Sequence, residues 1–153
     1  VYMLPALQGL GAPYMDPQQS ALIGGLTRGA TKAHVARAAM EGITFRVREM
    51  LDRIYEDSGL PRPSSLAADG GASANDLFMQ IQADALGQPV ERMAPIEATA
   101  FGAALLAGQA EGVWGPDAVD QLRKIDRTFE PTWSAEEREN RFDSWRKACG
   151  LIE

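Results

Sequence analysis

The sequence has very little of the two residue types that most often build metal centres and redox sites. Cysteine and histidine each occur once among 153 residues, as Cys149 and His34. A single cysteine excludes a disulfide within the chain and a metal site built from several thiolates. It also indicates a reducing compartment, so we expect a cytoplasmic protein. His34 has no neighbour in the sequence that would equip it for acid–base catalysis, and a structural role is favoured.

A net positive charge and long apolar runs are also missing from the sequence. The net charge of −6 offers no basic surface for a nucleic acid partner. No apolar run approaches the roughly 20 residues that cross a membrane, and the start, VYMLPAL, lacks the basic segment of a signal peptide. Because the chain begins at Val1 rather than methionine, we expect a processed product or a piece of a longer protein. The composition that remains, 45% hydrophobic and 24% charged, is typical of a folded globular domain.

The apolar periodicity predicts a series of strands and helices. An apolar stripe at alternating steps of four and three predicts a helix over about 31–58 that buries this stripe. The stripe consists of Ala36, Met40, Ile43, Val47, Met50 and Ile54. Arg48 and Glu49 lie off the stripe. The other predicted strands and helices are strands at 21–26, 66–68 and 89–93, helices at 75–86 and 97–111, and a last helix that begins at the Ser134–Glu137 capping box. The polar segment between 113 and 133 predicts no regular element.

The order of these elements favours an α/β domain with crossover connections. In such domains ligands bind beyond the carboxyl ends of the strands, where the next helix begins. The sequence DGGASAN, residues 69–75, lies at such a place. Two glycines there serve either a tight turn that needs backbone freedom or a ligand that comes closer to the main chain than a Cβ would allow. Taken alone, the residues favour the turn and leave the ligand open.

Several segments, in order along the chain, resemble segments of one protein family. They are GLGAPYMDP, the stretch from ALIGGL to HVARAAME, GLTRG within it, DGGASAN, FMQIQADALGQPVER and ATAFGAALLAG. Together they resemble the FGGY carbohydrate kinases, most of all those that phosphorylate glycerol. The resemblance implies an α/β, ribonuclease-H-like domain of the actin-like ATPase fold, of which this chain is the later part of the second domain. Residues 1–115 would form that incomplete domain and residues 116–153 a C-terminal extension with a terminal helix.

The same resemblance implies a nucleotide site. The DGGA motif would lie against the adenosine of ATP, with Gly70, Gly71 and Asn75 as the nucleotide contacts. The glycines would offer a backbone N–H or a bare Cα, and the Asn75 amide can both donate and accept hydrogen bonds. For Asp69 we expect first a structural role, holding the turn through its own backbone contacts, and second a contact with the nucleotide through water. The helix over 97–111 would pack against a counterpart in the other domain.

The machinery of phosphoryl transfer is not expected in these residues. The reaction needs a phosphate loop, Mg²⁺ ligands and a carboxylate base, and the resemblance puts all of them in the first domain and at the beginning of the second. We therefore expect no catalytic and no metal-binding residue here. The complete kinase would use ATP and Mg²⁺ and bind glycerol or a similar polyol in its N-terminal domain.

Two alternatives stay open. The segment Gly42–Val47 departs from the usual glycerol kinase pattern, which leaves a related polyol or pentulose kinase as the source of the chain. A stand-alone, non-catalytic nucleotide-binding or interaction domain is the other. We also expect a homo-oligomer, because an unpaired strand edge and an uncovered small-residue helix would both invite pairing with a second copy.

Overall fold

The computed structural model of the chain describes residues 1–94 and 98–152. In chain order the elements are β1 (Tyr2–Leu4), β2 (Leu22–Gly24), α1 (Lys32–Ser58), β3 (Leu66–Ala68), the 3-10 turn η1 (Gly71–Ala74), α2 (Asp76–Leu86), β4 (Val90–Ala94), α3 (Ala98–Ala110), α4 (Ala118–Leu122), β5 (Lys124–Phe129) and α5 (Ala135–Ala148). The mixed order confirms the α/β class. The predicted start of α3 at Glu97 lies outside the described residues.

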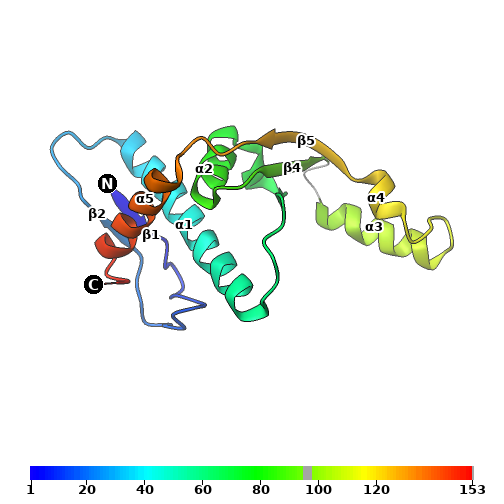
Figure 1. Ribbon diagram of the computed structural model, residues 1–153, viewed down its shortest axis with the longest axis horizontal. Coiled ribbons are helices and arrows are strands. Elements are labelled where there is room, and N and C mark those ends of the chain that lie inside the picture. The colour runs from blue at the N-terminus through cyan, green and yellow to red at the C-terminus, as the bar shows by residue number, and fades with distance from the viewer. Residues whose placement is uncertain (95–97, 153) are drawn as a thin grey trace.

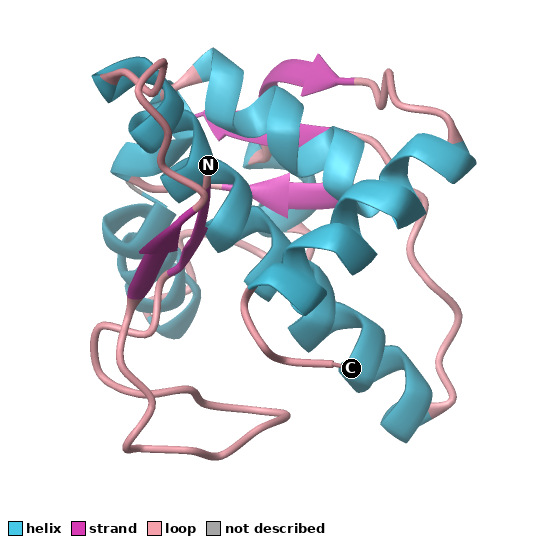
Figure 2. Cartoon of the chain, turned by 90° about the vertical axis from the view of Figure 1, so that its left-hand side faces the viewer, coloured by secondary structure: helices cyan, strands magenta, loops and turns pink. Residues whose placement is uncertain are grey.

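Two separate sheets are held apart by helices. β1 pairs antiparallel with β2, whereas β3, β4 and β5 form a sheet in that order, with β3 parallel and β5 antiparallel to β4. α1 packs against β1 on one side and α2 on the other, and α2 packs against β4 (Figures 1 and 2). The parallel β3–α2–β4 unit places the 69–75 turn at the end of β3 and the start of α2, as the sequence predicts.

The polar segment after residue 113 forms two elements that the sequence did not predict. α4 is short, and β5 carries the alternating polar sequence KIDRTF, in which only Phe129 is buried. β5 becomes a strand because β4 offers it a free edge, a tertiary cause that local sequence does not reveal. The expected C-terminal extension, residues 116–153, thus supplies the third strand of this sheet and, through α5, part of the core.

The predicted buried stripe of α1 is wrong. Ile43, Met50 and Ile54 are exposed, whereas the buried side of the helix includes Arg48 and Glu49. The apolar periodicity was real, but the partners of α1 lie on the adjacent side of the helix.

Two local features fix the side of α1 that is buried. At Gly42 the absence of a side chain lets β1 lie directly on the helix, because a Cβ there would collide with the carbonyl oxygen of Met3. The two buried charges are paired, Arg48 with Glu139 and Glu49 with Arg46, which offsets their desolvation.

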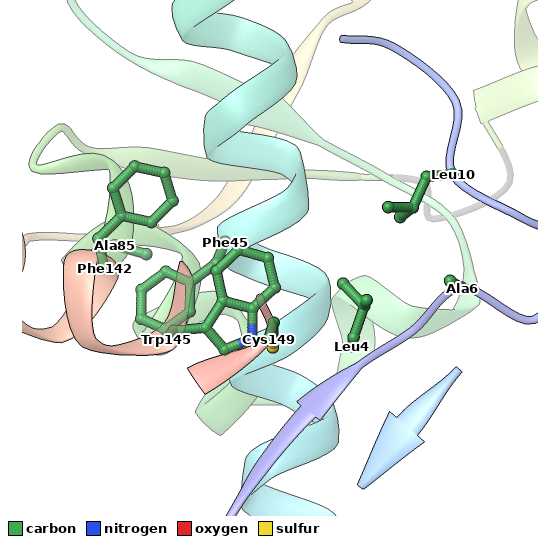
Figure 3. Packing of buried hydrophobic residues seen from close by; sticks show 8 residues of the cluster. All are labelled: Leu4, Ala6, Leu10, Phe45, Ala85, Phe142, Trp145 and Cys149. Carbon is green, nitrogen blue, oxygen red and sulfur yellow. The ribbon is translucent and has the colours of Figure 1, made fainter. Parts of the chain in front are cut away.

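The main core joins the two ends of the chain around α1. Phe45 of α1 packs against both Phe142 and Trp145 of α5, with ring centroids 5.7 and 5.4 Å away, and Leu4 belongs to the same cluster (Figure 3). The indole N–H of Trp145 donates a hydrogen bond of 2.9 Å to the carbonyl oxygen of Met3, which fastens α5 to β1. The predicted capping box of α5 is present on its Ser134 side, since Ser134 Oγ accepts the N–H of Glu137.

A second core lies between α2 and the three-stranded sheet. It contains Met79, Ala83, Leu86, Val90 and Phe129, from α2, β4 and β5. α3 and α4 project together beyond the open end of this sheet, at the right of Figure 1. α3 is alanine-rich, and its Leu106 is exposed. Leu105 of α3 is buried, but no extensive packing joins α3 to another helix or strand of the described residues.

Candidate nucleotide site

The glycine turn after β3 is held by its own residues. Gly70 has φ +82° and ψ 171°, a backbone conformation that only glycine adopts without strain. Its carbonyl oxygen accepts two hydrogen bonds from Ser73, one from the backbone N–H at 3.0 Å and one from Oγ at 2.7 Å. Ser73 is 1% exposed, so its hydroxyl is fully committed to this contact. The turn is therefore closed by its own residues, and Gly71, Ala72 and Ala74 are exposed on it.

Unlike Gly70, Gly71 does not need to be glycine for its backbone conformation. Its φ is not in the left-handed region, and a Cβ built on it would meet no atom of the described residues within 4 Å. Neither backbone conformation nor packing in this chain requires glycine at 71. A bare backbone that faces open space is what a ligand needs if it is to lie directly on the main chain.

Asn75 ends the turn and caps the next helix. Its Oδ1 accepts the N–H of Phe78 at 3.1 Å, and its backbone is extended, with φ −86° and ψ 106°. Capping uses the acceptor side of the amide and fixes its orientation. The NH₂ side donates to no acceptor within the described residues, so it is available to a ligand beside Gly71. Gly70, Gly71 and Asn75 thus lie in one turn between β3 and α2, and their contact with a nucleotide stays a prediction.

Two other sequence candidates have different outcomes. The side chain of Asp69 makes no hydrogen bond within residues 1–94 and 98–152, and Ser73 closes the turn instead, so the expected bracing role of Asp69 is wrong. The structural role of His34 is confirmed, because its Nδ1 lies 3.1 Å from the N–H of Thr31 and caps the start of α1.

Sequence reasoning missed the residues that brace the turn from the sheet. Arg92 of β4 donates from Nη1 to the carbonyl oxygen of Ser73 at 3.1 Å and to Oδ1 of Asp76 at 2.7 Å. Arg127 of β5 binds the other oxygen of Asp76. These partners are far apart in the sequence, and only the pairing of β4 with β3 and β5 brings them together. The one available signal was Asp76 itself, an acid in the first turn of a helix, where it is stabilised by the helix dipole.

The charged side chains beside the turn form ion pairs with one another: Arg92 with Asp76 and Asp126, and Arg127 with Asp76. The hydrogen bond from Arg92, with the charge of Arg127 behind it, lowers the pKa of Asp76. The hydrogen bonds to Asp76 and Asp126 raise the pKa of Arg92. Among the described residues no three His, Cys, Asp or Glu side chains lie together as metal ligands do.

A cavity of about 760 Å³ lies between β1, α1 and α5, where Glu41, Glu137 and Trp145 line it. In the part of the chain that the structure describes, no helix combines the length and the apolar character of a membrane span.

A strand, an open glycine turn and a capped helix, set in a mixed sheet, define an α/β domain. Comparison with known proteins assigns this domain. The family model described as "FGGY family of carbohydrate kinases, C-terminal domain" matches residues 1–111. The chain therefore belongs to the FGGY family of carbohydrate kinases, whose fold is the actin-like ATPase fold, and it matches the C-terminal domain.

Individual relatives agree with this assignment. The chain is 48% identical over 149 residues to a glycerol kinase of Caldanaerobacter subterraneus, a match that covers 97% of this chain and 30% of the relative. The crystal structure of Plasmodium falciparum glycerol kinase with ADP superimposes with a TM-score of 0.87 at 33% identity, over 99% of this chain and 31% of that one. A ligand-bound xylulose kinase from Lactobacillus acidophilus gives a TM-score of 0.74 at 26% identity, over 98% and 29%. The chain thus spans about 30% of the length of the relatives it matches.

Proposed function

We propose that this chain is the C-terminal, nucleotide-binding part of an ATP-dependent kinase that phosphorylates glycerol to glycerol 3-phosphate. The observation that carries the proposal is the bare backbone at Gly71, where neither conformation nor packing requires a glycine. The glycerol kinases it resembles, one of them with ADP in its structure, support the nucleotide and the substrate.

Each site residue then has a defined task. Gly70 supplies the backbone conformation of the turn, and Gly71 leaves the surface on which the adenosine part of ATP lies. Asn75 donates from the amide group that its capping bond leaves free. When bound, ATP supplies the phosphoryl group for transfer, and Mg²⁺ accompanies its phosphates. Within the described residues the chain contributes binding and orientation of the nucleotide.

The second candidate is a related kinase of the same family. The similarity to xylulose kinase favours it, and the 42–47 segment, GITFRV, departs from the usual glycerol kinase pattern. In the structure this segment carries Gly42 and Phe45, which pack against β1 and α5. The segment therefore takes part in the packing of α1. A homo-oligomer and a cytoplasmic location stay predictions.

The test is a substrate comparison with the complete gene product that contains this chain. ADP formation would be measured with ATP, Mg²⁺ and either glycerol, xylulose or gluconate. We expect kcat/KM for glycerol to exceed that for the other two by at least about a hundredfold, since a site built to bind a substrate's hydroxyls rejects a mismatched one strongly. A preference for xylulose would support the pentulose kinase instead. Nucleotide binding without any substrate-dependent ADP formation would support the non-catalytic domain.

A further inference from the structure

Arg92 is the residue through which the sheet holds the glycine turn. Its Nη1 reaches both the Ser73 carbonyl oxygen, at 3.1 Å, and Asp76 Oδ1, at 2.7 Å, while its Nε donates to Asp126 Oδ2 at 2.6 Å. One planar guanidinium therefore joins the end of η1, the first turn of α2 and strand β5. Such a fork of charge-assisted hydrogen bonds fixes direction as well as distance.

The position of this guanidinium is itself strongly determined. The Arg92 side chain is 13% exposed, and its guanidinium carbon lies 5.4 Å from the centroid of the Phe129 ring, a buried member of the second core. In the parallel pair β3–β4, Arg92 stands opposite Ala68, the last residue before Asp69 and the glycines. It is also the last residue of β4 before the register with β5 shifts. Backbone register and an aromatic platform thus deliver the side chain to the turn.

These contacts support an inference about Arg92 that rests on the proposed function. We propose that Arg92 is a positioning residue for the nucleotide, which holds the Gly70–Ser73 turn and the start of α2 so that Gly71 and Asn75 present a fixed surface to ATP. Ser73 is the link, because it receives Arg92 at its carbonyl oxygen and closes the turn onto Gly70 with its hydroxyl and N–H.

Arg92 acts through the turn that it holds. Its Nε and Nη1 are occupied by Asp126, Ser73 and Asp76, and little of the side chain faces solvent. A residue in this position changes ligand affinity through the geometry of the groups it holds, and small displacements of such groups have large effects.

The experiment compares Arg92→Lys and Arg92→Gln in the complete gene product. Lysine keeps the charge but cannot reach all three partners at once, and glutamine removes the charge. We expect the Kd for MgADP, measured by calorimetry, to rise about tenfold in Arg92→Gln and by less in Arg92→Lys, with KM for glycerol within about twofold of the parent value. The matched control is Arg123→Gln. Arg123 pairs at 3.0 Å with Glu91, which lies in β4 next to Arg92 but away from the turn. It should leave the Kd for MgADP unchanged.

The outcomes separate this inference from the proposed function. If the parent protein binds MgADP and folded Arg92→Lys and Arg92→Gln bind it equally well, Arg92 only stabilises the fold and the inference is overturned alone. If KM for glycerol rises as much as the Kd for MgADP, the effect is a general loosening, and the positioning role is again overturned. If the parent protein binds no MgADP, the proposed function fails and the inference with it. Should Arg92→Gln not fold, Arg92→Lys decides between these results.

Discussion

The hydroxyl of Tyr14 donates a hydrogen bond of 2.7 Å to Oε1 of Glu49, and this contact joins the glycine-rich loop after β1 to the middle of α1. Arg46 binds the other oxygen of Glu49, and its guanidinium also donates to the carbonyl oxygen of Ala12 at 2.8 Å. A buried carboxylate thus organises a loop that contains no regular structure. Burial, followed by the hydrogen bond to Glu49, raises the pKa of Tyr14 well above its ordinary value.

The first prediction follows from this contact. Tyr14→Phe should lower the free energy of unfolding by about 1–3 kcal/mol. The reason is that the buried, charged carboxylate of Glu49 loses the hydrogen bond that the Tyr14 hydroxyl donates to it. The control is Tyr55→Phe in α1, the helix that carries Glu49. The Tyr55 hydroxyl has no hydrogen-bond partner among the described residues. Urea unfolding of both variants measures the difference. Equal values for the two would mean that the Tyr14 hydroxyl contributes nothing to the loop.

The second prediction concerns the two sides of α1. Phe45, 3% exposed, lies in the aromatic cluster, whereas Ile54, 51% exposed, belongs to the apolar stripe that faces outward. Phe45→Ala should cost about 3–5 kcal/mol of unfolding free energy, and Ile54→Ala less than about 0.5 kcal/mol. Thermal unfolding of the isolated chain provides the measurement. A larger loss for Ile54→Ala would show that the stripe is covered and that α1 is buried on the side that the periodicity predicts.

This contrast shows where sequence reasoning succeeds and where it stops. The ends of α1, α2 and β3 were predictable because they depend on local signals: the glycines at 59 and 87, the cap at Asn75 and a short apolar strand. The buried side of α1 was not, because it depends on where β1 and α5 lie. β5 was missed for the same reason, since a polar, exposed strand exists only through pairing with β4.

The candidate site divides in the same way. Gly70, Gly71 and Asn75 lie within six residues and follow a strand, so their proximity could be read from the sequence. Ser73 closes the turn by a hydrogen bond to the carbonyl oxygen of Gly70, three residues earlier, and no sequence pattern indicated this bond. Arg92 joins the site across the parallel register of β3 and β4. Tertiary pairing, and nothing in the local sequence, determines that contribution.

The third prediction concerns the reactivity of the one cysteine. Burial, and then the charge of Glu49, raises the pKa of the Cys149 thiol to about 11. At pH 8 about 0.1% of the thiol would be ionised, so alkylation in the native state should be slower than that of a free thiol by about two orders of magnitude. Iodoacetamide labelling followed by mass spectrometry, with and without denaturant, measures this. Rapid native labelling would contradict the burial of α5 against the core.

The fourth prediction is a pH dependence from Asp76. Because Arg92 and Arg127 lower its folded pKa below the ordinary unfolded value of about 3.9, its contribution to stability is present above that value and is lost as the pH falls toward the folded pKa. The difference in unfolding free energy between the parent and Asp76→Asn should therefore be constant from about pH 5 to 7 and shrink below about pH 4. Denaturant titrations at several pH values provide the data. A difference that grows on acidification would contradict the ion pair.

The fifth and most direct test concerns the bare backbone at Gly71. In the complete gene product, calorimetry would compare MgADP binding by the parent, by Gly71→Val and by Gly115→Val. Gly115 is a matched control, because it too is exposed, lies outside the left-handed region and would place a Cβ in open space. We predict that Gly71→Val raises the Kd for MgADP at least about tenfold, since its side chain occupies the nucleotide's place, whereas Gly115→Val leaves it unchanged. An unchanged Kd in folded Gly71→Val would contradict the account, because the nucleotide would then not lie on this turn.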